Sequence, residues 1–181
     1  MTLLSTILLR QSIAVVNEVI LNPTQMSNNK VSSILVGVAG EYFAAAELSR
    51  RGYIASITLR NTKGIDIIAT NEAASKSINI QVKTSSGRTT RGGWILNQKA
   101  EQMSEKNLFY IFVKIPKDNE IPSFHIVPSR NLARAVKSGH KKWLETPGKK
   151  GQKHNDSSMR YWRDEDNKYL DRWDLLGLDK K

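Results

Sequence analysis

A short segment of strict alternation constrains the fold of this chain more than any other sequence feature. From Ser77 to Lys83, three apolar residues alternate with three polar ones: Ile78, Ile80 and Val82 against Asn79, Gln81 and Lys83. Successive side chains of a β-strand point to opposite faces of its sheet. The segment therefore predicts a strand that buries one face and presents Gln81 and Lys83 on the other.

The segment before this strand predicts a helix from Ser33 to Arg51, ended by Gly52, because glycine tolerates the left-handed helix cap. Four of its residues share one face at helical spacing: Gly37, Gly40, Glu41 and Ala44. That face is nearly bare except for one carboxylate. It allows the helix to lie close against a sheet and to bring Glu41 toward the strand ends. The alternative is an ordinary solvent-facing glutamate.

Two further strands are predicted between the helix and the alternating segment, over Tyr53–Leu59 and Ile65–Ala69. Asp66 falls inside the second of them, where strand propensity disfavours aspartate, so a compensating interaction is expected. A hairpin loop over residues 70–76 would place Asp66 beside Gln81 and Lys83.

Such a set of residues predicts metal-assisted chemistry. The Glu41 and Asp66 carboxylates are oxygen ligands suited to Mg²⁺, and the Val82 carbonyl can add another. Water bound to the metal becomes more acidic, and the metal neutralises charge that builds on a phosphate. Lys83 is placed to orient the attacking water or to stabilise the transition state.

Three short motifs now resemble a known family: Gly40-Glu41, Gly64-Ile65-Asp66-Ile67 and Gln81-Val82-Lys83-Thr84. In order and spacing they are similar to the PD-(D/E)xK nuclease superfamily, nearest to its Holliday-junction-resolvase-like and small bacterial endonuclease-like members. The resemblance covers about residues 33–115. It implies an α/β fold with a restriction-endonuclease-like core, in which a mixed central sheet is flanked by helices.

The resemblance also implies metal ligation by Glu41 and Asp66, a catalytic role for Lys83, and Mg²⁺, or Mn²⁺ in its place, as cofactor. Gln81 stands where the family usually has an acidic residue. Its amide still offers one oxygen ligand but removes a negative charge from the site. The implied function is a metal-dependent nuclease that hydrolyses phosphodiester bonds, in DNA more than in RNA, by metal-activated water. The alternative is an inactive nuclease-fold protein that binds nucleic acid or serves as an assembly subunit.

Charge supports a polyanionic partner. The 181 residues include 28 Lys+Arg and 17 Asp+Glu, for a formal charge of +11. Arg88 and Arg91, in the loop after Lys83, are expected to contact phosphate, and so are Lys141 and Lys142 in the basic run of residues 130–153. For the segment with Arg88 and Arg91, the alternative is a mobile surface loop without a ligand. For residues 130–153, the alternative is a solvated helix followed by a mobile loop. The chain contains no cysteine, which excludes a disulfide framework and a thiolate zinc site.

The second half predicts a covered strand over Phe109–Ile115 and a neighbouring strand over Phe124–Val127. A basic helix should follow from Ser129 to Gly139, then a mobile loop, then a helix within Tyr161–Leu178 that seals the core with its tryptophans. Trp94 could stack on a base, but packing inside the protein is favoured.

Residues 1–30 predict an appendage helix and linker, which need not belong to the native chain if translation begins at Met26. The domain organisation is then this appendage, a nuclease-like core over 31–128, and the basic helix, loop and terminal helix over 129–181. Residues 1–21 lack the features of a signal peptide or membrane span, so we expect a cytoplasmic protein without a membrane partner. A homodimer is compatible with the resemblance, although no interface is identifiable.

Overall fold

The computed structural model describes residues 31–59, 64–86, 92–117 and 120–179. The chain separates into two units, residues 1–32 and 33–181, and the second unit holds every helix and strand named below. The predicted appendage helix and the loop that carries Arg88 and Arg91 lie outside the described residues.

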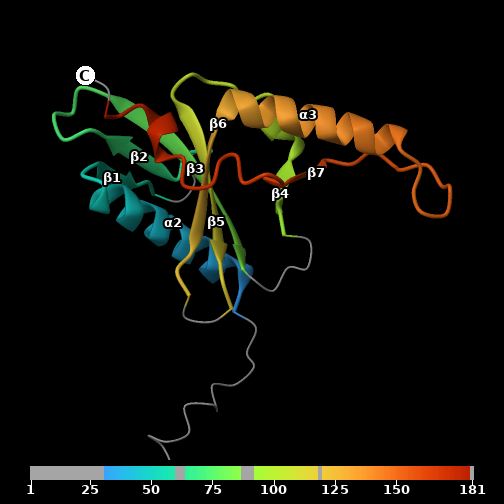
Figure 1. The fold of residues 1–181 in the computed structure, drawn as a ribbon, viewed down its shortest axis with the longest axis horizontal. Helices are drawn as coiled ribbons and strands as arrows, with labels where there is room; N and C mark the ends of the chain where they lie inside the picture. Colours follow the sequence, from blue (N-terminus) through green and yellow to red (C-terminus); the bar gives the residue numbers. More distant parts are fainter. Residues whose placement is uncertain (1–30, 60–63, 87–91, 118–119, 180–181) are drawn as a thin grey trace, which may run out of the picture. The chain divides into compact units, whose positions relative to one another are not determined.

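A five-stranded mixed sheet forms the centre of the fold (Figure 1). Its strands lie in the order β1 (Ile54–Ile57), β2 (Ile67–Thr70), β3 (Ser77–Ser86), β5 (Leu108–Ile115) and β6 (Ser123–Pro128). Strands β3 and β5 run parallel, and the other neighbouring pairs are antiparallel. The predicted mixed central sheet flanked by helices is confirmed.

Helix α2 (Ser33–Arg50) covers one face of this sheet. Gly40, Ala44 and Leu48, spaced one turn apart, are its buried residues. Ala44 and Leu48 pack against the apolar side chains of β3 that the alternation predicted, Ile78, Ile80 and Val82. At Gly40 the backbone approaches so closely that a Cβ atom would lie 1.9 Å from Thr84 Oγ1. The small residue therefore determines how near α2 comes to β3.

The opposite face of the sheet is covered by α3 (Ser129–Glu145) and by a small two-stranded sheet, β4 (Trp94–Asn97) with β7 (Met159–Trp162). A 3-10 helix, η2 (Gln98–Glu101), follows β4. Trp94 is 4% exposed and packs on Phe112 and Trp162, with ring centroids 5.0 and 5.6 Å apart. The favoured packing role of Trp94 is confirmed.

The predicted helix over Tyr161–Leu178 is wrong. This stretch begins with the end of β7 and contains a 3-10 helix, η3 (Trp173–Leu176). The Asp164 carboxylate accepts hydrogen bonds from the backbone amides of Lys168 and Tyr169. Asn167 and Asp171 both have φ of 52°. A side-chain cap and two left-handed residues therefore replace the regular helical bonds.

The basic helix also extends further than expected. Gly139 lies within α3, which ends at Glu145, where Thr146 Oγ1 donates to the Lys142 carbonyl at 2.7 Å. Strand β2 begins later than predicted, at Ile67, one residue after Asp66. The conflict between aspartate and strand propensity therefore does not arise.

Candidate functional site

Asp66 lies beside β3, as the hairpin predicted. Its backbone amide donates to the Ile80 carbonyl at 2.8 Å, and its own carbonyl accepts from the Thr58 amide at 2.9 Å. Its carboxylate oxygen Oδ2 accepts from the Val82 amide at 2.7 Å. The carboxylate thus takes the place of a strand carbonyl at the point where β2 begins, which fixes the Asp66 side chain against β3 between Gln81 and Lys83.

Gln81 and Lys83 line one pocket of about 330 Å³. They belong to the face of β3 opposite to α2, while Val82 between them is 7% exposed and packs in the α2 core. Neither the Gln81 amide nor the Lys83 ammonium has a hydrogen-bond or ion-pair partner among the described residues. Both groups are therefore available to a ligand.

The pocket lies between β3 and β5 on one side and β4 with η2 on the other. The residues that line it are Gly64, Gln81, Lys83, Leu96, Asn97, Lys99, Ala100, Met103 and Tyr110. Lys99, Asn97 and Tyr110 were not identified from the sequence as site residues. Tyr110 belongs to an apolar strand whose pattern indicates only burial, and Lys99 is one surface lysine among many. A fold that sets β4 opposite β3 was needed to bring them to Gln81.

Tyr110 connects the pocket to Asp66. Its side chain is 1% exposed, and its hydroxyl donates to Met103 Sδ at 3.3 Å. Burial, and next the negative charge of Asp66, raise the pKa of Tyr110 to about 12. A phenol is already neutral at pH 7 at its ordinary pKa of about 10, and the raised pKa keeps the proton of Tyr110 well into the alkaline range.

The Val82 carbonyl faces the same strand edge as Asp66. The N–H and C=O groups of one strand residue point to the same side, and the Val82 amide is bonded to the Asp66 carboxylate. The structure thus places the predicted main-chain oxygen on the Asp66 side of β3.

Glu41 is placed differently from the other candidate residues. It follows Gly40 on α2, which covers the face of the sheet opposite to Gln81 and Lys83. The close approach of Gly40 to Thr84 brings this part of the helix to the residue after Lys83. Glu41 is half-exposed there, and its ligation of a metal stays a prediction.

The site offers oxygen donors of the kind that Mg²⁺ requires. No group of three or more His, Cys, Asp or Glu side chains that could hold a metal is present among the residues that the structure describes. One carboxylate (Asp66), one amide oxygen (Gln81) and one main-chain carbonyl (Val82) are nevertheless all hard oxygen donors. Mg²⁺ is commonly bound through one or two carboxylates, several waters and substrate phosphates. These residues fit a metal that is completed by the substrate.

The predicted nucleic-acid contacts Lys141 and Lys142 both lie on α3. Lys141 lines a shallow groove between α3 and the C-terminal segment, together with three other cationic side chains: Arg134, Lys137 and Lys168. It also lies 3.9 Å from Glu145. Lys142 does not line this groove. The sequence did not identify Lys168, because only the tertiary fold brings the C-terminal segment alongside α3.

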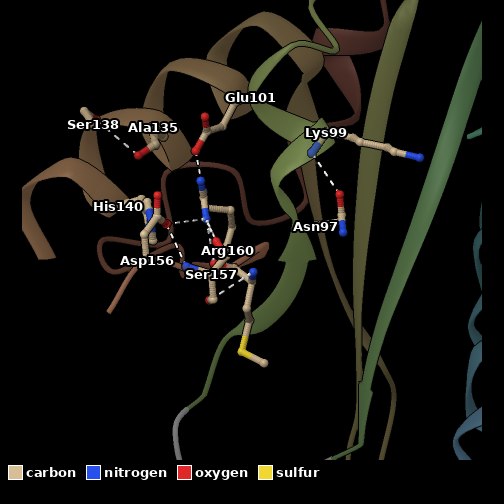
Figure 2. A network of polar contacts seen from close by, with 10 residues as sticks. Asn97, Lys99, Glu101, Ala135, Ser138, His140, Asp156, Ser157 and Arg160 are labelled. Carbon is tan, nitrogen blue, oxygen red and sulfur yellow. Dashed lines mark hydrogen bonds and ion pairs between the residues drawn. The ribbon is translucent and has the colours of Figure 1, made fainter. Parts of the chain in front are cut away.

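A network of polar contacts fixes the far end of α3 (Figure 2). Arg160 of β7 is 6% exposed, forms an ion pair with Glu101 of η2, and donates to the Ser157 and Met159 carbonyls. His140 of α3 contacts the Asp156 carboxylate at 2.8 Å, and this contact holds the pKa of that carboxyl below its usual value. These contacts attach the loop after α3 to η2, which borders the pocket.

The described part of the chain has no helix that is long and apolar enough to cross a membrane. No protein-family model matches the sequence, and no curated protein is significantly similar to it. Among solved structures, the bacterial homing endonuclease I-Ssp6803I is similar in fold, with a TM-score of 0.48 and 14% sequence identity. The similarity covers 81% of this chain and 92% of that chain.

Proposed function

We propose that this chain is a metal-dependent nuclease that hydrolyses phosphodiester bonds, in DNA more than in RNA. The observation that carries the proposal is the position of Asp66. Its carboxylate is bonded to the Val82 amide between two polar side chains, Gln81 and Lys83, that face one pocket. The motif resemblance to PD-(D/E)xK nucleases supports the same assignment.

Each residue of the site has a separate part in the proposed reaction. Asp66, Gln81 and the Val82 carbonyl would hold Mg²⁺, which supplies an acidified water and neutralises charge on the scissile phosphate. Lys83, half-buried beside them, stabilises the negative charge of the transition state and orients the attacking water. The neutral Tyr110 hydroxyl borders the same space and adds no negative charge that would repel the phosphate.

The nucleic-acid backbone would also contact α3. Its groove carries four cations, Arg134, Lys137, Lys141 and Lys168, and none of the described residues that line it is acidic. Contacts of this kind orient a duplex without reading its sequence.

Cleavage of supercoiled, linear and branched DNA in Mg²⁺ or Mn²⁺ tests the proposal. We expect the wild type to cut at least one of these substrates, and the double variant Asp66→Ala, Lys83→Ala to lose the activity. Lys76→Ala, in the β2–β3 turn, is the matched control and should keep it. Equal cleavage by the wild type and the double variant would refute the assignment.

One observation favours a second function, a non-catalytic nucleic-acid-binding protein. Gln81 is neutral, and the described residues contain no cluster of three acidic or histidine ligands. Titration calorimetry with Mg²⁺ distinguishes the two functions. A nuclease should bind the ion with a stoichiometry that Asp66→Ala removes, whereas a binding protein of this fold should give no specific heat.

A further inference from the structure

The residues that line the pocket beside Asp66 differ from those of a surface that binds phosphate alone. Its walls are apolar: Leu96 and Ala100 are each 4% exposed, Tyr110 is 1% exposed, and Met103 is half-buried against Gly64. A phosphate gains nothing from such walls, because it is fully hydrated in water and needs donors when it binds. The apolar walls therefore indicate that the portion of the ligand inside the pocket has apolar faces.

The polar groups of the pocket are few and of two kinds. Gln81 and Asn97 contribute side-chain amides, and Lys83 and Lys99 contribute ammonium groups. The Asn97 Oδ1 atom accepts from the Lys99 amide at 3.0 Å, which leaves the Asn97 amide hydrogens for a ligand. Amides pair with the donor and acceptor edges of nucleobases, and ammonium groups pair with phosphates.

We infer that this pocket receives the nucleobase of a single unpaired nucleotide of the substrate, with the neighbouring phosphates at Lys83 and Lys99. A flat heterocycle has two apolar faces for the Leu96, Met103 and Tyr110 walls and a polar edge for the two amides. The volume of about 330 Å³ is near the lower limit of ligand pockets, which suits one nucleotide.

The inference rests on the proposed nuclease function and specifies its substrate class. A base within a stacked duplex cannot enter a pocket without being extruded, which costs a few kcal/mol. The cost is smallest for a base that is already unpaired. The preferred substrate is therefore nucleic acid with an unpaired nucleotide near the scissile bond, at a branch, a gap or a bulge.

Binding measured in EDTA tests the pocket independently of cleavage. A DNA duplex with one unpaired thymidine is compared, by fluorescence anisotropy, with the same duplex carrying an abasic site at that position. The wild type should bind the thymidine form about tenfold more tightly, as expected for one buried base. Equal affinity for the two duplexes would overturn the inference.

Met103→Trp fills the pocket and should abolish the tenfold preference, so that the thymidine and abasic duplexes bind with equal affinity. The matched control is Met159→Trp, at an exposed position of β7, which should keep the preference. If Met103→Trp also keeps it, the base does not enter this pocket.

Photo-crosslinking of the wild type gives a readout that needs no variant. With 5-iododeoxyuridine as the unpaired nucleotide, we expect the crosslink at Tyr110 or Met103. A crosslink confined to α3 or its following loop would overturn the inference. If the base preference persists but no DNA is cleaved in Mg²⁺, the pocket belongs to a binding protein and the nuclease assignment alone fails.

Discussion

At the scale of single residues, Asp66 has two separable roles. Its oxygen Oδ2 completes the hydrogen bonding of the Val82 amide, and its negative charge is the metal-binding group of the proposed site. The first role needs only an acceptor oxygen, whereas the second needs a carboxylate. Substitutions can therefore test the two roles one at a time.

We expect Asp66→Asn and Asp66→Ala to lose cleavage alike, by about 100-fold or more, because both remove the charge that binds the metal. Their stabilities should differ. Asparagine still accepts from the Val82 amide, whereas alanine leaves that amide unsatisfied, at a cost of about 1–3 kcal/mol. Urea denaturation of the two variants measures the difference, and equal stability would show that the Val82 bond contributes nothing.

A second residue-scale prediction concerns Tyr110 at alkaline pH. Its pKa is about 12 in the folded chain and about 10 when unfolded. Between these values the unfolded chain has lost the proton and the folded chain has not, so the free energy of unfolding falls as pH rises, by up to about 1.4 kcal/mol per pH unit.

Urea denaturation from pH 9 to 12 measures this effect, and Tyr110→Phe should reduce the slope. Tyr53 provides a comparison, because its hydroxyl donates to Asp179 at 2.6 Å and its pKa is likewise raised to about 12, mainly by burial. Tyr53→Phe should reduce the slope as well. An unchanged slope in both variants would contradict the raised pKa values of Tyr53 and Tyr110.

At the scale of secondary-structure elements, replacing glycine by alanine should have opposite effects on stability at two positions of α2. A Cβ at Gly40 would overlap Thr84, whereas a Cβ at Gly37 would meet nothing within 4 Å. Gly40→Ala should destabilise by about 1–3 kcal/mol, because α2 must move away from β3. Gly37→Ala should stabilise by about 0.5–1 kcal/mol through helix propensity alone.

Thermal or urea unfolding of these two variants gives the comparison directly, with each glycine as the control for the other. The same displacement of α2 would move the segment next to Glu41. If Gly40→Ala keeps full stability, the close contact of α2 with Thr84 does not determine the helix position.

Two strands of the central sheet could be predicted from sequence patterns alone. Alternation over Ser77–Lys83 indicated which face of β3 is buried, and the run over Phe109–Ile115 indicated a strand covered on both faces. Both patterns can be read within a single strand, because successive side chains alternate between its two faces and each face is either buried or exposed. The C-terminal segment has helical spacing of apolar residues, but Asp164, Asn167 and Asp171 form local bonds and turns that spacing does not report.

At the scale of the whole molecule, four of the 28 Lys and Arg side chains meet in one groove. The α3 groove contains Arg134, Lys137, Lys141 and Lys168, with no acidic residue among the described side chains that line it. If it follows a DNA backbone, each cation releases about one counterion on binding. The affinity for DNA should then depend steeply on salt.

We expect Lys137→Ala to reduce the slope of log K against log salt by about 0.9, and Lys76→Ala, in the β2–β3 turn, to leave it unchanged. Both lysines carry the same charge, so net charge alone cannot explain a difference. Anisotropy titrations from 50 to 300 mM salt, at about 1 nM labelled duplex, measure the slopes. Identical slopes for the two variants would show that the groove does not bind the backbone.

The sequence by itself determined the mixed α/β class, the helix with its small-residue face, and the placement of Asp66 beside Gln81 and Lys83. These features come from local periodicity and from a short hairpin, which bring together residues close in the chain. Only the tertiary structure placed Tyr110, Asn97 and Lys99 in the pocket of Gln81 and Lys83, and set Lys168 alongside α3. It also decided that the helix with Glu41 covers the other face of the sheet. The pocket positions depend on the crossover between β3 and β5 and on the pairing of β4 with β7. Contacts between segments so distant in the chain leave no periodic signal in either segment alone.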